Sequence, residues 1–212
     1  MAKISSGIQF QAPEGAVSGE AISQWTQDWW SFAVSSGSTD GGKLETSPSG
    51  GQMFLVGGSF GGDVNGAFTV AAGTPLLVPV FNVLMTDFTG TGPNPKNITT
   101  GTPAAARVYE SLWQDNVTNL SLTITDNATG AVYTPTNLLD DFAKTGWFTL
   151  NAGDLGSIPK SQSVGYWSVV EGLKPGSYTL DFGGSLKAFD DPAHGISQPA
   201  FSVHVTDQVT VV

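Results

Sequence analysis

The residues best placed to do chemistry lie in an acidic segment near the C-terminal end of the chain. Asp190 and Asp191 are adjacent, and His194 follows them in the same turn-like stretch. Carboxylate oxygens are the ligands that Ca²⁺ prefers, and an imidazole can add a nitrogen ligand. The sequence therefore favours Asp190, Asp191 and His194 as a metal site, with Ca²⁺ as the one cofactor that the residues suggest.

Two further acidic segments, residues 61–65 and residues 140–141, are alternative cation sites. None of these segments matches the calcium loop of an EF-hand. Adjacent aspartates also occur as solvated turn residues or as helix caps, and that interpretation stands beside the metal site in each case.

Nucleophilic catalysis finds little support in the sequence. The chain has two histidines and no cysteine. His204 lies in an alternating run in which Phe201, Val203 and Val205 share the other face, so strand periodicity accounts for it. No Gly-x-Ser-x-Gly motif places a serine next to His194 or His204. We therefore expect no catalytic residue.

Two other kinds of enzyme site are also unsupported. Glu45, Glu110 and Glu171 are too isolated to nominate the facing carboxylates of a glycosidase. The glycine-rich residues 57–62 lack the Lys-Ser/Thr of a phosphate loop, so they predict a hairpin or a bulge. A hydrolase remains only as a third possibility.

One segment has the periodicity of a helix. Its apolar residues recur at steps of three, four and three positions, namely Ile22, Trp25, Trp29 and Phe32. The spacing predicts a helix at about residues 19–34, with Ser18 as its N-cap. Trp30 points away from this face, so we expect it at a rim or contact surface, where its ring could stack on a sugar. Trp147 and Trp167 lie in expected strands and predict core positions.

The rest of the chain has the pattern of an all-β domain. Short apolar runs separated by Gly, Pro and Asn predict strands at residues 52–56, 67–70, 76–81, 120–125, 147–150, 166–170, 177–182 and 201–212. Short helical segments are expected at residues 103–113 and 137–143. The pattern predicts a single antiparallel β-sandwich, jelly-roll-like, with two or three short helices.

The organisation of the chain follows from these elements. Residues 1–17 predict an N-terminal arm or edge strand, and residues 18–212 the sandwich domain. Long polar loops are expected at residues 36–51, 86–103 and 186–199. Within the strands, Asn65-Gly66 predicts a hairpin turn, and Pro79 predicts an edge position or a bulge.

Composition narrows the possible partners. The chain has 212 residues and a formal net charge of −10, from 8 basic and 18 acidic residues. Such an acidic chain is unsuited to a nucleic-acid backbone. The absence of cysteine excludes disulfides and thiolate metal sites. No stretch approaches the roughly 20 apolar residues of a membrane helix, so no membrane span is expected.

Several motifs together resemble those of uncharacterised bacterial secreted proteins. These motifs are a Trp-rich helix at residues 25–32, Phe-Leu-Val-Gly-Gly-Ser-Phe-Gly-Gly at residues 54–62, an Ala-Gly-Thr-Pro hairpin within residues 70–82, and the aromatic and glycine pattern of residues 165–184. The resemblance implies an extracellular or cell-surface setting and carries over no activity. The N-terminal residues show no apolar leader, which leaves a cytoplasmic chain, a trimmed leader or another export route open.

Two functions are therefore expected. The first is a non-enzymatic structural protein of the bacterial exterior that self-assembles when its end strands, residues 8–10 and 209–212, add to a neighbouring copy. Pairing of these strands within their own chain is the alternative. The second function is a carbohydrate- or calcium-binding β-sandwich module that uses the loops, the acidic segment and Trp30.

Overall fold

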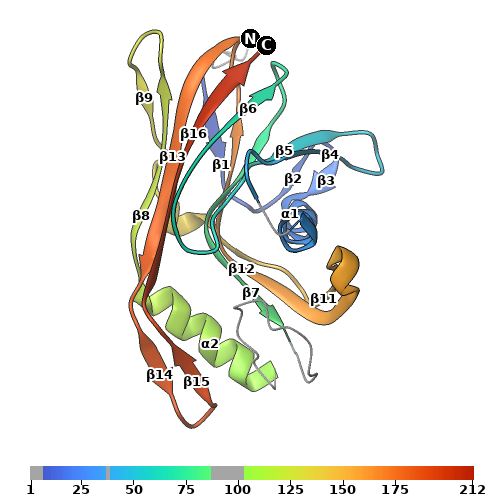
Figure 1. Cartoon of the computed structure of the whole chain (residues 1–212), viewed down its shortest axis with the longest axis vertical. Coiled ribbons are helices and arrows are strands. Elements are labelled where there is room, and N and C mark those ends of the chain that lie inside the picture. Colours follow the sequence, from blue (N-terminus) through green and yellow to red (C-terminus); the bar gives the residue numbers. More distant parts are fainter. Residues whose placement is uncertain (1–6, 37–38, 87–102) are drawn as a thin grey trace.

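The computed structural model describes residues 7–36, 39–86 and 103–212, and this part of the chain is mostly β, with 52% strand and two α-helices. The larger sheet has seven strands (Figure 1). Its main path runs β1 (Gln9–Gln11), β12 (Ser157–Glu171), β7 (Leu76–Thr86), β5 (Gln52–Leu55) and β4 (Lys43–Thr46), while β10 (Phe142–Lys144) and β11 (Phe148–Asn151) pair with other stretches of β12.

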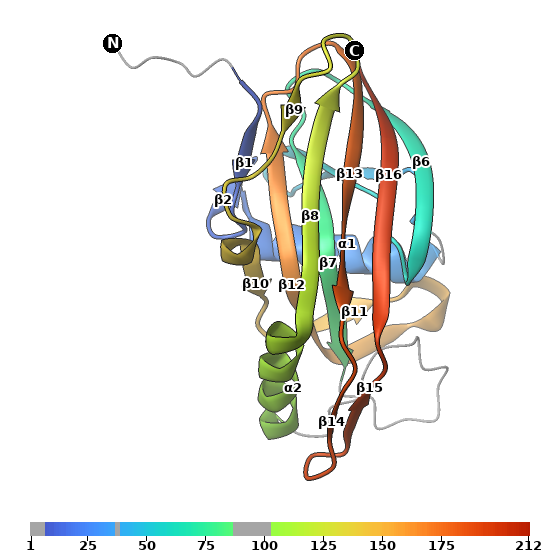
Figure 2. The ribbon, with the colours of Figure 1, turned by 90° about the vertical axis from the view of Figure 1, so that its left-hand side faces the viewer.

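The second sheet has five strands of different lengths, and Figure 2 shows this sheet face on. Its order is β6 (Gly62–Val70), β16 (Phe201–Val211), β13 (Gly176–Leu186), β8 (Val117–Asp126) and β9 (Val132–Tyr133). Two small hairpins complete the strands, β2 (Ala16–Val17) with β3 (Glu20–Ala21) and β14 (Phe189–Asp191) with β15 (Ile196–Gln198).

The sheets are mixed, so the expectation of a purely antiparallel fold is wrong. β5 pairs in parallel with β7, and β6 pairs in parallel with β16. The chain leaves β5 in one sheet and enters β6 in the other, so no hairpin joins these strands. The hairpin turn expected at Asn65-Gly66 is also absent. Both residues lie inside β6, where they pair with Thr206 and Asp207 of β16.

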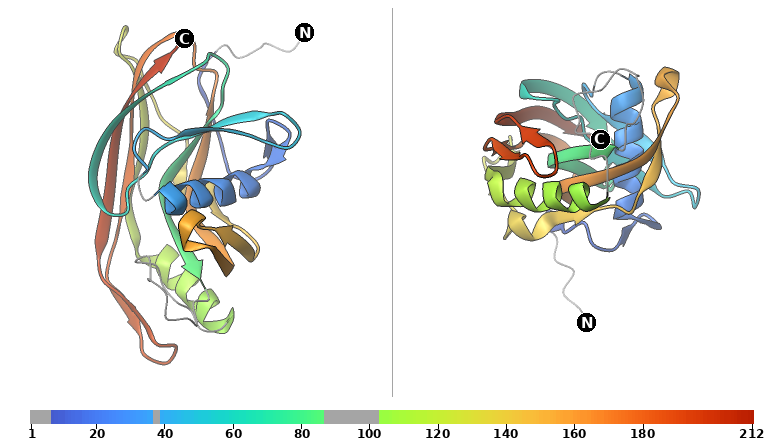
Figure 3. Two further views of the ribbon diagram at one scale, coloured as in Figure 1. Left: turned by 45° about the vertical axis from the view of Figure 1, so that its right-hand side comes forward. Right: turned by 90° about the horizontal axis from the view of Figure 1, so that it is seen from below.

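The seven-stranded sheet lies between the five-stranded sheet and helix α1 (Ile22–Ser36), as Figure 3 shows. An inner core fills the space between the two sheets and includes Val78, Phe81, Leu180, Phe182 and Val205. An outer core lies under α1 on the other face of the larger sheet. Because both faces of β7 are covered, its residues are apolar from Leu76 to Phe81 and again from Val83 to Met85 instead of alternating.

Pro79 lies at a β-bulge in β7, which confirms one of its two expected positions. The register passes from Phe81 opposite Tyr166 to Val78 opposite Ser168, so Pro79 and Val80 face one residue of β12. A bulge shifts the alternation of side chains by one residue. As a result, both Val80 and Phe81 point into the inner core.

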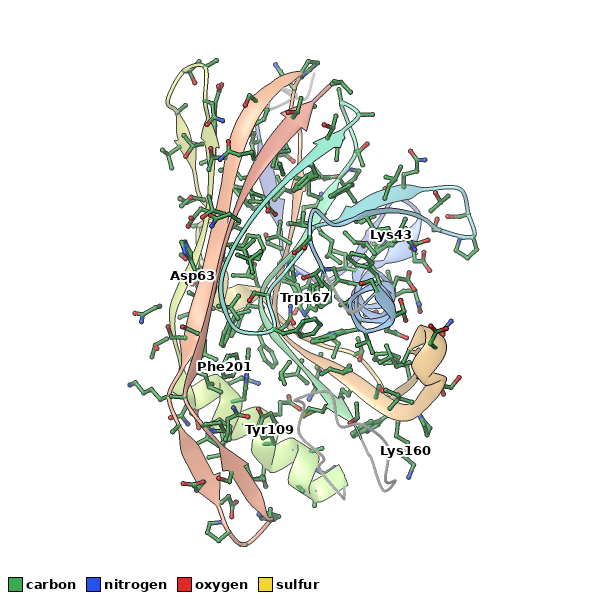
Figure 4. All side chains as sticks on the ribbon, viewed as in Figure 1. Lys43, Asp63, Tyr109, Lys160, Trp167 and Phe201 are labelled. Atoms are coloured by element: carbon green, nitrogen blue, oxygen red, sulfur yellow. The ribbon has the colours of Figure 1, made fainter. Side chains whose placement is uncertain are left out.

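Helix α1 confirms the helix expected from the apolar spacing, but its start differs. Ser18 is not its N-cap, because Ser18 and Gly19 both have positive φ and form the turn between β2 and β3. The Ser18 hydroxyl donates to the carbonyl of Gln52 instead. The indoles of Trp25 and Trp29 anchor the helix in the outer core, and Trp167 faces them from the sheet (Figure 4).

Other local expectations have mixed outcomes. Helix α2 (Pro103–Asn116) confirms the second helix, and the 3₁₀ helix η1 (Leu138–Asp141) confirms the helical turn. Residues 186–199 form the β14–β15 hairpin instead of a loop, and β4 interrupts the loop expected at residues 36–51. Of the third expected loop, residues 87–102 lie outside the described residues, as do residues 37–38 and residues 1–6 of the arm.

Both ends of the described chain pair within the molecule. β1 pairs with the end of β12, in agreement with an N-terminal edge strand. The C-terminal strand β16 pairs with β13 on one side and with β6 on the other. Neither α-helix of the described residues is long and apolar enough to cross a bilayer.

Candidate ligand groove

A groove of about 780 Å³ opens between the edges of the two large sheets. β1 forms one wall, β9 and the following residues 134–137 form the other, and η1 closes the end. The groove therefore lies where the larger sheet ends at β1 and the smaller sheet ends at β9.

Asp141 is the buried polar residue of this groove. Asn137 caps η1 by accepting a hydrogen bond from the Leu139 amide at 3.2 Å, and Asp141 is the last residue of that helix. β10 begins at the next residue and pairs Phe142 with Tyr166 of β12. This pairing holds the Asp141 side chain against the sheet, where it is only 6% exposed.

Ser168 of β12 accompanies Asp141. It is fully buried and shares the inner face of β12 with Tyr166 and Val170, which belong to the inner core. Neither Asp141 Oδ2 nor Ser168 Oγ has a hydrogen-bond partner among the residues that the structure describes. The hydroxyl is near enough to lower the pKa of the carboxyl, but the two groups do not form a hydrogen bond of normal geometry. Two buried polar atoms are thus left unpaired at one place.

The electrostatics of Asp141 decide its charge at neutral pH. Burial raises its pKa to about 6, and the charge of Asp140 adds to the rise. At pH 7 a group with this pKa is still roughly nine-tenths ionised. A buried, ionised carboxylate that lacks a partner is costly, and a ligand that donates hydrogen bonds to it would recover much of that cost.

The walls of the groove combine uncharged polar groups with aromatic surface. Thr134, Thr136 and Asn137 supply hydroxyl and amide groups, and Phe10 and Tyr133 supply half-buried rings. Of the described residues that line the groove, none is a lysine, arginine or histidine. Such a surface suits a neutral ligand that has both hydroxyl groups and C–H faces.

The metal site expected at the C-terminal end is brought together only in part. Asp191 Oδ2 lies 2.9 Å from His194 Nδ1, and this hydrogen bond lowers the pKa of Asp191. Asp190 is exposed and, as the neighbouring residue of β14, points to the opposite face. Within the described residues, no group of three or more histidine, aspartate and glutamate side chains is arranged to hold a metal ion.

The expected exposure of two tryptophans is wrong. Trp30 is 3% exposed, and its indole N–H donates to Ser163 Oγ at 3.1 Å, so its ring cannot stack on a ligand. β11 and the adjoining part of β12 pack on that side of α1 and make its buried face broader than one stripe. Trp147, expected in the core, lies just before β11 and is 42% exposed.

The remaining candidates stay apart. His204 is exposed on the opposite face from Val203 and Val205, as expected, and its Nε2 lies 2.9 Å from Asp181 Oδ2. The glutamates are separated as well: Glu45 pairs with Lys43 on β4, Glu110 with Lys144, and Glu171 with Gln11. These contacts do not bring any two of the glutamates together across the groove.

A weak signal for the groove was present in the sequence, namely the adjacent pair Asp140 and Asp141. It could not show that one of the pair is buried, because that depends on β10 pairing with β12. Comparisons with protein-family models, curated proteins and solved structures found no match to this chain. The groove and its side chains therefore carry the functional conclusion.

Proposed function

We propose that this protein binds a saccharide in the groove beside Asp141 and that it does so without catalysis. The observation that carries the proposal is the nearly buried carboxylate of Asp141, a residue that lines an open groove and has one oxygen without a hydrogen-bond partner among the described residues. We also infer that the two large sheets form one jelly-roll-like β-sandwich around the inner core, and that the protein works outside the bacterial cell.

A sugar matches the groove in chemistry. Adjacent hydroxyls of a pyranose donate to a carboxylate, and its C–H faces pack on aromatic rings. Hydrogen bonds to a charged group contribute about 1.5–3 kcal/mol each. Two such bonds to Asp141, with packing on Tyr133, would account for a dissociation constant between the millimolar and the micromolar range.

Binding without catalysis agrees with the position of the carboxyl groups. A glycosidase places two carboxyl groups on opposite sides of the scissile bond. Asp140 and Asp141 are consecutive residues of η1 and so project from the same wall of the groove. A hydrolase would need a second acid from β1 or β9, and the residues of these strands that line the groove are uncharged.

A glycan array at pH 7.5 with wild type, Asp141→Asn and the control Asp191→Asn, whose residue lies outside the groove, tests the proposal. We expect wild type and Asp191→Asn to bind the same glycans, and Asp141→Asn to lose them. The amide has the shape of the carboxylate and removes an unpaired buried charge, so this variant should fold. Equal binding by Asp141→Asn, or a wild type that binds no glycan on the array, would contradict the proposal.

A further inference from the structure

A second buried carboxylate lies at the other edge of the five-stranded sheet. Asp207 of β16 is 2% exposed and points to the same face as Val205 and Val209, both of which belong to the inner core. One of its oxygens lies against Gly66 of β6, whose backbone N–H donates a hydrogen bond to the carboxylate. The other oxygen, Oδ2, is buried and has no hydrogen-bond partner in the described part of the chain.

The backbone segments around Asp207 lie so close together that three glycines leave no space for a side chain. A Cβ atom at Gly66 would lie 2.4 Å from Asp207 Oδ1. A Cβ atom at Gly42 would lie 2.3 Å from the carbonyl oxygen of Leu55, and one at Gly57 would lie 2.0 Å from that of Thr39. Residues 39–42 are therefore pressed against β5 and β6.

This packing brings the segment that carries Asp40 close to Asp207, because a Cβ atom at Gly66 would lie 3.7 Å from the backbone nitrogen of Gly41 and 2.4 Å from Asp207 Oδ1. Thr39 is buried and its hydroxyl donates to the carbonyl of Gly58 at 2.5 Å, which fixes the segment that carries Asp40. Gly41 follows, close to the backbone oxygen of Ala67 in β6. The negative charge of Asp40 is near enough to raise the pKa of Asp207.

At neutral pH, protonation of Asp207 does not remove its buried negative charge. Burial is the main cause that raises the pKa of Asp207, to about 6, so the group is still mostly ionised at pH 7. In the described part of the chain, Asp207 has no ion pair with a basic side chain. The buried charge of Asp207 therefore has no basic partner among the described residues and lies in the field of Asp40, and a cation would compensate for it.

We propose that Asp207 and Asp40 bind a Ca²⁺ ion, with backbone carbonyls beside them such as that of Ala67 as further ligands. All of these donors are oxygens, which a hard cation prefers, and Ca²⁺ tolerates an irregular set that water completes. This site is separate from the saccharide groove and does not depend on it.

Occupation of the site would link three elements. Asp207 lies on β16, Asp40 on the segment before β4, and Ala67 on the edge strand β6. A ligand that binds only the folded state raises the melting temperature by mass action. Calcium should therefore stabilise the protein against heat.

The test is thermal melting in CaCl₂ and in EDTA for wild type, Asp207→Asn, Asp40→Asn and the control Asp191→Asn, with calorimetry to count bound ions. We expect calcium to raise the melting temperature of wild type and of Asp191→Asn, with one ion bound per chain. Asp207→Asn should lose the shift and melt higher than wild type in EDTA, and Asp40→Asn should lose most of the shift.

Two results would overturn the proposal. One is a wild-type protein whose melting temperature calcium does not change. The other is a calcium shift that survives in both Asp207→Asn and Asp40→Asn, or that disappears in Asp191→Asn alone, which would place the ion at the β14–β15 hairpin. Asp40→Asn keeps the test decisive if Asp207→Asn fails to fold, because Asp40 is exposed.

Discussion

Asp141 and Asp207 have the same electrostatic problem in different surroundings. Each is a nearly buried aspartate with one oxygen that lacks a hydrogen-bond partner within residues 7–36, 39–86 and 103–212. Asp141 borders an open groove with uncharged polar walls, whereas Asp207 is enclosed by backbone and lies near a second carboxylate. The space around each carboxylate is what distinguishes a site for an organic ligand from a site for an ion.

The two carboxyl groups predict that mild acid stabilises the metal-free protein. Both have a pKa raised to about 6, whereas an unfolded aspartate titrates near 3.9. The folded state then binds more protons than the unfolded state between about pH 4 and pH 6. The free energy of unfolding should therefore rise as the pH falls through that window, by about 1 kcal/mol for each group between pH 7.5 and pH 5.

Urea unfolding in EDTA at these two pH values measures the effect. Because an asparagine does not titrate, the Asp141→Asn, Asp207→Asn double variant should lose most of the gain. A wild type that is less stable at pH 5 than at pH 7.5 would show that the two carboxyl groups are not buried as described.

At the scale of elements, the periodicity of apolar residues predicted those features that depend on local packing. The steps between Ile22, Trp25 and Trp29 define one face of α1, and the structure buries that face. The same pattern could not show that β11 and β12 cover a second side of the helix and enclose Trp30. The dipeptide Asn65-Gly66 likewise did not reveal that strand β6 continues past these two residues. The course of β6 depends on its parallel pairing with β16, which is distant in the sequence.

Trp30 and Trp147, whose burial was wrongly predicted, allow a direct comparison of what each side chain contributes to stability. Trp30→Ala should lower the free energy of unfolding by about 3–5 kcal/mol, because it removes a buried ring and its hydrogen bond to Ser163. Trp147→Ala should lower it by less than about 1 kcal/mol, because the ring is partly exposed. Chemical denaturation of both variants checks the order, and equal losses would contradict the burial of Trp30.

At the scale of the molecule, the β-rich fold class follows from the composition and from the Gly, Pro and Asn residues that separate the apolar runs. The pairing of strands within the sheets does not follow from them. Hydrophobic alternation locates strands one by one. It does not show which strand lies next to which, and so it missed both parallel pairs and the groove between β1 and β9. At the metal site expected at Asp190, Asp191 and His194, the β14–β15 hairpin brings Asp191 and His194 together and turns Asp190 to the opposite face, which the sequence alone does not show.

The C-terminal strand is expected to hold the fold together. Val209 and Val211 are buried in the inner core, and β16 is paired on both sides. Removal of residues 209–212 should therefore lower the melting temperature strongly and leave the oligomeric state of the folded fraction unchanged. Melting and light scattering on the truncated chain check this. A truncated protein that is equally stable but associates differently would favour self-assembly through this end.

The most direct test of the saccharide site compares the two places where a sugar could bind. Calorimetric titration with a glycan selected on the array would be performed at pH 7.5 on wild type, Asp141→Asn and Trp147→Ala. If the groove is the site, Asp141→Asn weakens binding at least about tenfold, or 1.4 kcal/mol, and Trp147→Ala leaves it unchanged. The reverse result, with binding lost in Trp147→Ala and kept in Asp141→Asn, would place the sugar on the exposed indole and contradict the role of Asp141.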